Sequence, residues 1–205
     1  VKGYSINSTL FSVSDCQSII KKAVVERLKS KYGISWFEET GPIHQIQFSV
    51  MKDKVSLLLD TSGAGLSRFI KEKPALIKPN RAELSALGYD PPKMWKDALD
   101  SCGKIYEKYG TAVLCTLDSD GSVYFGGEGA YRIEVEPRKI VGFSGAGDSY
   151  LAAFIYKRFL LGEEIADSLA FASAASVAKI GLEGSIMPTR EEIEDSLGSV
   201  RVTKI

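Results

Sequence analysis

Residues 141–150 read VGFSGAGDSY, and the apolar run LAAFIYKRFLL that follows is typical of a buried helix. The first turn of a helix leaves four backbone N–H groups without intrahelical partners, and the helix dipole adds positive potential there. Gly145 and Gly147 carry no Cβ, so the backbone at this turn can approach a ligand closely. Together these features predict an anion site, suited to phosphate, at the start of the helix.

Asp148 comes directly after these glycines. A carboxylate next to a phosphate site repels the phosphate, so Asp148 needs a separate reason to be there. One interpretation is structural, because Asp is favoured at the start of a helix. The other is catalytic, because a carboxylate here can accept a proton from a hydroxyl group that attacks a phosphoryl group. The residues alone leave both interpretations open.

The segment KPNRAE contains a second polar pair, Asn80 and Glu83, at a predicted strand-to-helix turn. Residues three apart lie near one face of a helix start. An amide oxygen and a carboxylate are ligands suited to Mg²⁺ or to its bound waters. The same spacing is also typical of a helix-capping pattern, so a structural interpretation stays beside the metal one.

These segments must be positioned by the elements around them. Apolar strands are predicted at 55–60, 74–79 and 111–118, with helices after 80 and over 95–109 and 164–180. Alternating apolar strands and helices indicate an α/β protein with a largely parallel, covered sheet. Ligands of such sheets bind beyond the carboxyl ends of strands, which points to DTSGAG, KPNRAE and DSDGS.

The front of the chain gives weaker signals. A helix is predicted over 14–32 and short strands over 34–39 and 44–50, while the first ten residues show no clear period. A hairpin is predicted from residues 122–125 and 131–136, and the glycines of SGAGL interrupt the strand before them.

Composition narrows the class of partner. Lys plus Arg equals Asp plus Glu at 26 each, and this net charge of zero gives no general attraction to nucleic acid or anionic membrane. The three cysteines are widely spaced, which favours a reduced compartment over a disulfide framework. No apolar run approaches the roughly 20 residues of a membrane span. We therefore expect a cytoplasmic protein with no nucleic-acid or membrane partner.

Several segments between Val55 and Pro188 resemble, in order, the ribokinase-like (PfkB) sugar kinase family. GAGDSYLAAFIY is similar to its signature, IKPNRAEL to its KPN-x-x-E segment, CTLDSDGSVYF to its strand–turn–strand, and FASAASVAKIGLEGSIMP to its alanine-rich helix and glycine turn. LLLDTSGAGL and KPALIKPN resemble the branch of 1-phosphofructokinase and tagatose-6-phosphate kinase. The resemblance implies a three-layer α/β/α fold with a mostly parallel central sheet and a small β lid, whose completeness the sequence leaves open.

The resemblance also implies roles for single residues. Asp148 would be the base that acts on the sugar hydroxyl, and Asn80 and Glu83 would position Mg²⁺ on the phosphates of ATP. Asp60 would belong to the same polar cluster, behind the direct ligands.

The remaining implied roles concern the nucleotide. The backbone amides of three residues would hold the γ-phosphate: Gly145, Ala146 and Gly147. Thr116 and Gly121 would border the nucleotide. The family normally has glycine where this chain has Asp118, a carboxylate that could repel nucleotide phosphate.

The implied activity is ATP-dependent transfer of the γ-phosphoryl group to a hydroxyl of a sugar phosphate: fructose 1-phosphate, fructose 6-phosphate or tagatose 6-phosphate. The alternatives are a non-catalytic nucleotide-binding remnant, or a kinase for ribose or another unphosphorylated sugar. A dinucleotide-dependent oxidoreductase ranks far behind, because G-x-G-x-x-G after a first strand is missing. A homodimer that shares a lid strand is compatible with the family.

The resemblance divides the chain into a front portion, 1–54, and a nucleotide-binding and catalytic core, 55–205. The family's Gly-Gly motif, which meets the sugar, is not found before Val55. We interpret the front portion as a remnant of the lid region.

Overall fold

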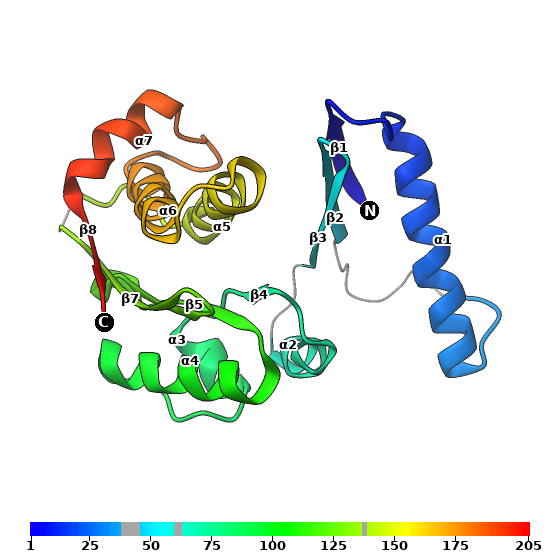
Figure 1. The fold of residues 1–205 in the computed structure, drawn as a ribbon, viewed down its shortest axis with the longest axis horizontal. Helices are drawn as coiled ribbons and strands as arrows, with labels where there is room; N and C mark the ends of the chain where they lie inside the picture. The colour runs from blue at the N-terminus through cyan, green and yellow to red at the C-terminus, as the bar shows by residue number, and fades with distance from the viewer. Residues whose placement is uncertain (38–45, 60–62, 137–138) are drawn as a thin grey trace. The chain divides into compact units, whose positions relative to one another are not determined.

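The computed structural model describes residues 1–37, 46–59, 63–136 and 139–205 (Figure 1). The chain divides into two compact units, Val1–Thr61 and Ser62–Ile205, named unit 1 and unit 2 here. Each unit has its own sheet. Among the helices of the described residues, none combines the length and the apolar character needed to cross a bilayer.

Unit 1 consists of β1 (Lys2–Ile6), α1 (Val13–Tyr32), β2 (Ile46–Met51) and β3 (Lys54–Leu59). β2 lies between the other two strands, parallel to β1 and antiparallel to β3. The parallel pair is possible because α1 returns the chain to the same end of the sheet. Strand β1 was not predicted, and its alternating half-buried and exposed residues explain the weak signal.

The hairpin between β2 and β3 turns through Lys52 and Asp53, which both have positive φ, 49° and 62°. Two such residues form the turn whose twist matches an antiparallel pair. The Asp53 carboxylate accepts hydrogen bonds of 2.7 Å from the hydroxyls of Ser8 and Thr9 and from the Thr9 amide. These hydrogen bonds lower the pKa of Asp53, and the bonds from the two hydroxyls contribute more than the bond from the Thr9 amide. This cluster ties the loop after β1 to the hairpin.

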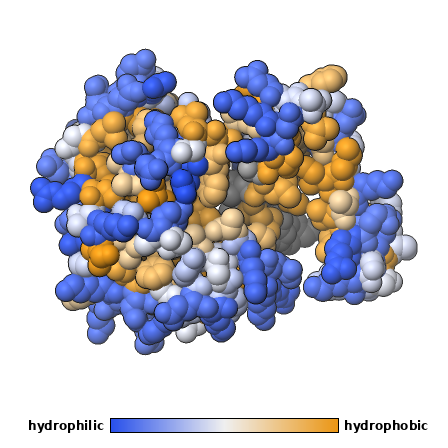
Figure 2. All heavy atoms as spheres, viewed as in Figure 1, coloured by the Kyte–Doolittle hydropathy of each residue, from blue (hydrophilic) through white to orange (hydrophobic). Residues whose placement is uncertain are grey.

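The predicted strand over 34–39 is wrong for its described part, since residues 34–37 form no strand. Trp36 is 80% exposed there. Ile34 and Trp36 favour strands only when a neighbouring strand can pack against them, and the segment follows directly on Gly33, which ends α1. The strand predicted over 44–50 is confirmed from Ile46 onward as β2. In Figure 2, apolar residues lie over the strands of unit 1, where Val55 and Leu57 are exposed.

Unit 2 is built on a five-stranded sheet in the order β4-β5-β6-β7-β8. Its strands are β4 (Leu76–Ile77), β5 (Ala112–Thr116), β6 (Ser122–Gly126), β7 (Gly129–Val135) and β8 (Val200–Lys204). One face is covered by α3 (Arg81–Ala86) and α4 (Trp95–Tyr109), and the other by α5 (Ala146–Ile155), α6 (Ile165–Ile180) and α7 (Arg190–Ser196) (Figure 1). Five short helical segments complete the described part of unit 2: α2 (Gly63–Phe69), the 3₁₀ helices Ile70–Glu72, Asp118–Asp120 and Leu197–Ser199, and the π-helix Tyr156–Leu161. The layers are therefore α/β/α.

Both faces of the sheet carry a hydrophobic core. Along β5, Leu114 packs into the cluster with α5 and α6, while Val113 and Cys115 pack into the cluster with α4. All three are fully buried, which explains why this strand reads as one apolar run.

The directions of the strands differ from the prediction of a mostly parallel sheet. Within the described residues of unit 2, β4 and β5 pair in parallel, whereas β5, β6, β7 and β8 pair antiparallel. The chain segments between β5 and β7 are turns of only a few residues, and a parallel connection needs a dozen or more. The glycine-rich segment SGAGL, expected to break the strand before it, begins helix α2.

Gly121 ends the turn between β5 and β6 at φ 82° and ψ −126°. A Cβ at this position would lie 2.1 Å from the carbonyl oxygen of Ile133 on β7. Both the backbone conformation and the close approach of β7 therefore require glycine here.

We expect Gly121→Ala to lower the free energy of unfolding of unit 2 by roughly 3 kcal/mol or more, because strain and a steric clash add. Gly198→Ala is the matched control, since a Cβ at Gly198 has no neighbour within 4 Å, and it should change stability by less than about 0.5 kcal/mol. Chemical denaturation followed by circular dichroism measures both. Equal stability of the two variants would contradict the close packing described for Gly121.

Candidate active site

The ends of β4 and β5 bring two of the predicted segments together. Asn80, which follows β4, forms a parallel backbone bridge with Thr116, the last residue of β5. The Thr116 amide donates a 3.1 Å hydrogen bond to the Pro79 carbonyl. Parallel strands end at the same edge of a sheet, and ligands of α/β sheets bind beyond that edge. KPNRAE and the turn after β5 therefore share one edge.

The predicted anion site is present at the start of α5. Gly145 precedes the helix in the left-handed conformation, with φ 79°, and Ala146 is the first helical residue. The Ala146 amide donates to the Phe143 carbonyl at 3.3 Å. The amides of Gly147 and Asp148 lie in the first turn, where a helix offers them no acceptor. Donors and helix dipole thus converge on the space before α5.

Two lysines lie beside this turn, and neither was predicted from the sequence. A Cβ on Gly147 would lie 3.2 Å from Nζ of Lys78, and a Cβ on Gly145 would lie 3.3 Å from Cε of Lys179. Lys179 is 1% exposed, and its ammonium donates to the Gly184 carbonyl at 2.9 Å. Lys78 directly follows β4, so its position at a strand end could have singled it out. Lys179 lies in an alanine-rich helix and gave no such signal.

Asp148 lies in the first turn of α5 with an exposed side chain. Within the described part of the chain, no hydrogen bond or ion pair of 4 Å or less engages its carboxylate. A capping role would consume the carboxylate oxygens, so this geometry leaves Asp148 available to a substrate. The structural interpretation of Asp148 loses its main support.

Asn80 and Glu83 behave differently, because they form a complete capping box at the start of α3. The Asn80 side-chain oxygen accepts from the Glu83 amide at 2.9 Å, and the Asn80 amide donates to Oε2 of Glu83 at 2.9 Å. The capping interpretation of this pair is therefore correct as geometry. It uses one of the two Glu83 carboxylate oxygens, and Oε1 is not part of the box.

The turn that contains Gly121 also contains Asp118, a non-glycine residue with positive φ, 55°. The Leu117 amide donates to the Gly121 carbonyl at 2.9 Å and closes the turn. Ser122, the next residue, shares a 2.9 Å hydrogen bond with the buried Tyr150 hydroxyl of α5. Burial raises the pKa of Tyr150 well above its ordinary value, so this hydroxyl stays neutral. This bond connects the helix of the anion site to the turn after β5. Asp60 lies outside the described residues.

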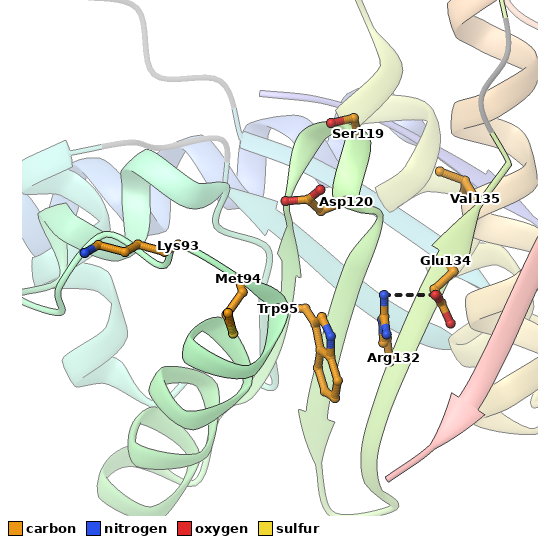
Figure 3. A pocket seen from close by; sticks show the side chains of 8 residues that line it. All are labelled: Lys93, Met94, Trp95, Ser119, Asp120, Arg132, Glu134 and Val135. Atoms are coloured by element: carbon orange, nitrogen blue, oxygen red, sulfur yellow. Dashed lines mark ion pairs between the residues drawn. The ribbon is translucent and has the colours of Figure 1, made fainter.

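A pocket of about 400 Å³ lies on the opposite face of the sheet (Figure 3). Its walls come from the turn after β5, the start of α4 and β7, with the lining residues Lys93, Met94, Trp95, Ser119, Asp120, Arg132, Glu134 and Val135. The Arg132 guanidinium stacks 4.6 Å from the centre of the Trp95 ring and pairs with Glu134 at 2.9 Å. Arg132 alternates along β7 with Tyr131 and Ile133, which pack toward α5 and α6. The pocket therefore lies on the α4 face of the sheet, whereas the helix of the anion site packs on the other face.

Comparison with known proteins decides the family. The family described as pfkB family carbohydrate kinase matches residues 44–192, almost three quarters of the chain. The chain belongs to the pfkB family of carbohydrate kinases. The resemblance drawn from the sequence motifs is therefore confirmed.

Curated pfkB relatives include a 1-phosphofructokinase of Borreliella burgdorferi, 32% identical over 79% of this chain and 52% of the relative. A D-tagatose-1-phosphate kinase of Bacillus licheniformis is 31% identical over 60% of this chain and 41% of the relative. The chain thus spans about half of the length of the pfkB relatives that it matches.

Solved pfkB structures show the fold. A structure described as a putative phosphofructokinase from Staphylococcus aureus matches with a TM-score of 0.65 at 18% identity, over 99% of this chain and 57% of that one. Arabidopsis thaliana ribokinase, solved with ribose and ATP, matches with a TM-score of 0.54 at 20% identity, over 77% of this chain and 70% of that one. The predicted ribokinase-like α/β fold is confirmed.

The front of the chain has a second likeness, which the sequence motifs did not reveal. The family described as THUMP domain matches residues 1–60, almost the whole of unit 1. A putative RNA methyltransferase of Bacillus subtilis, YpsC, is 49% identical over 33% of this chain and 18% of the relative. Residues 44–60, which include β2 and β3, belong to both family matches.

We expect Lys78→Met to weaken binding of MgATP by about 10- to 100-fold, the range of one hydrogen bond from a charged group. Lys71→Met is the matched control, because Lys71 is exposed on the 3₁₀ helix Ile70–Glu72. Isothermal titration calorimetry measures both affinities. If both variants bind like the parent protein, Lys78 does not contact the phosphates.

Proposed function

We propose that the protein transfers the γ-phosphoryl group of ATP to a hydroxyl group of a sugar phosphate. The observation that carries this proposal is the first turn of α5. Backbone N–H donors, the nearby Lys78 ammonium and the unengaged Asp148 carboxylate occur together there. Such a site can hold a phosphoryl group and accept a proton beside it.

In this reaction Asp148 accepts the proton of the attacking hydroxyl, and the oxygen then bonds to the γ-phosphorus as the bond to the ADP oxygen breaks. The amides of Gly145, Ala146 and Gly147 are assigned to the charge that spreads over the transferring group, and the Ala146 amide would exchange its 3.3 Å bond to the Phe143 carbonyl for this role. Thr116 and Gly121 border the nucleotide at the neighbouring strand end. The pfkB family membership and the shared sheet edge support these assignments.

Mg²⁺ fits the oxygen donors at the start of α3. Mg²⁺ is usually bound by one or two carboxylates together with substrate phosphates and waters. Glu83 offers the carboxylate oxygen outside the capping box, and the Asn80 amide oxygen, which accepts the Glu83 amide inside the box, offers its second lone pair. Among the described residues no three His, Cys, Asp or Glu side chains gather as a metal cluster, which agrees with a site completed by nucleotide phosphates. Mg²⁺ would neutralise phosphate charge there.

The acceptor that we propose is a ketohexose phosphate. The curated relatives act, by their names, on fructose 1-phosphate and D-tagatose 1-phosphate. Fructose 1-phosphate, fructose 6-phosphate and the tagatose phosphates are the candidates within this class, and ribose is the competing acceptor outside it. A cytoplasmic location and a homodimer are part of the same proposal.

Release of ADP from MgATP tests the proposal, with fructose 1-phosphate, fructose 6-phosphate, both tagatose phosphates and ribose as acceptors. Asp148→Asn keeps the shape of the turn and removes the base, so we expect turnover to fall about 10²- to 10⁴-fold with MgATP affinity nearly unchanged. Unchanged turnover in this variant would refute the role of Asp148. MgATP binding by the parent protein without any acceptor-dependent release would favour the non-catalytic alternative.

We also propose a second activity, RNA binding by unit 1, because the THUMP match covers residues 1–60 and a relative 49% identical over 33% of this chain is described as a putative RNA methyltransferase. Helix α1 carries five basic side chains and two acidic ones, a net charge of +3. Lys21, Lys22 and Arg27 are exposed on it. A basic helix can neutralise backbone phosphates even when the whole chain has no net charge. We infer that unit 1 contacts RNA through α1.

We expect the double variant Lys21→Glu with Lys22→Glu to weaken binding of a labelled single-stranded RNA. Loss of two phosphate contacts should also reduce the slope of log affinity against log salt by about 1.4. Fluorescence anisotropy across a salt series measures both quantities. Lys104→Glu with Lys108→Glu on α4 is the matched control, and an equal effect of the two double variants would exclude a specific role of α1.

A further inference from the structure

Two carboxylates stand in the turn that is proposed to border the nucleotide. Asp118 and Asp120 belong to the 3₁₀ segment between Thr116 and Gly121, and their side chains are 83% and 53% exposed. Two carboxylates beside a bound triphosphate would oppose its binding unless a cation compensates their charges. The turn therefore needs a partner to serve a nucleotide site.

Arg81 is that partner. Its Nη2 lies 2.7 Å from Oδ2 of Asp120, and its Nε lies 3.9 Å from Oδ2 of Asp118. The Arg81 side chain is only 27% exposed, so its charge is screened less by water than the two carboxylates are. One guanidinium thus faces both acidic side chains of the turn.

The same guanidinium also binds backbone on both sides. Nη2 donates to the Leu117 carbonyl at 3.3 Å, and Nη1 donates to the carbonyls of Pro92 and Lys93. The planar fork of arginine can make such bonds in several directions at once, whereas a lysine ammonium cannot match that geometry. Arg81 therefore fixes the turn against the segment before α4.

Arg81 is also the first residue of α3 and follows Asn80 directly. Two connections therefore reach the end of β5 and the turn after it. Asn80 contributes the backbone bridge to Thr116, and Arg81 contributes its side-chain bonds to the turn. The turn is consequently held to the start of α3 at two successive residues. Asp120, one of the partners of Arg81, also lines the pocket on the α4 face (Figure 3).

We propose that Arg81 is a positioning residue that sets the affinity for the nucleotide phosphates. It acts through the turn, by neutralising Asp118 and Asp120 and by fixing the backbone of Leu117, and does not itself contact the nucleotide. This inference rests on the proposed kinase function. It explains how a turn with an aspartate in place of the usual glycine can serve a phosphate site.

The test compares affinities for MgATP and for adenosine by isothermal titration calorimetry. We expect Arg81→Met to weaken MgATP binding about tenfold or more, as for loss of a partly buried charge, and to leave adenosine binding nearly unchanged. In the Arg81→Met background, Asp118→Asn with Asp120→Asn should restore most of the lost affinity. A purely structural role of Arg81 would predict no such rescue and an equal loss for adenosine.

Asp118→Asn with Asp120→Asn in the parent protein tests the proposal without removing Arg81, in case Arg81→Met does not fold. Removal of both negative charges should tighten MgATP binding a few-fold at low salt, whereas Asp100→Asn, the control on α4, should not. Unchanged affinity in the double variant would overturn the inference and leave the proposed function standing. No binding of MgATP by the parent protein would overturn both.

Discussion

The candidate site depends on one backbone pairing, the bridge between Asn80 and Thr116 at the ends of β4 and β5. β4 itself is only two residues long, so this bridge extends a very short parallel pair. Without it, the start of α3 and the turn after β5 would lose their common edge. The lysine before Pro79 would also lose its place beside α5, because its position follows from the same strand end. Short strands can be sufficient here because a buried strand, β5, supplies the neighbouring backbone.

Charge at this edge is balanced locally, within a chain of zero net charge. Lys78 and Lys179 stand beside the turn of α5, and Arg81 faces the acids of the neighbouring turn. Asp148 is the acid that has no such partner among the described residues. A carboxylate next to an anion site opposes the binding of phosphate, and the acids of the neighbouring turn pair with Arg81. Asp148 is the exception that a proton-accepting role would explain.

Local features of the site could be predicted from the sequence, because they depend on neighbours within a few residues. The left-handed Gly145, the helix after it and the pairing of Asn80 with Glu83 are of this kind. The contacts of Lys78 and Arg81 could not be predicted, since they join segments that meet only after the sheet has formed. The hairpin of β6 and β7 was predicted and is confirmed. The expectation of a mostly parallel sheet did not hold for unit 2, because burial on both faces was taken as a sign of parallel pairing.

Unit 1 shows a different limit of sequence reasoning. The residues of unit 1 were interpreted as a lid remnant of the pfkB family. The short, partly exposed β1 shows no hydrophobic period that would have contradicted this interpretation. The likeness to a THUMP domain extends over residues 1–60, and the motifs discussed from the sequence lie almost entirely after this range. The hairpin of β2 and β3 belongs to both family matches, so the two matches overlap within one sheet.

The burial of Lys179 has a consequence for chemical modification. Reagents and enzymes that acylate lysine reach only amines at the surface, and this ammonium is enclosed between Gly145 and the Gly184 carbonyl. Lys78 on the other side of the turn is half-buried and open to such attack. The two cations beside the same anion site therefore differ in their accessibility to chemical modification.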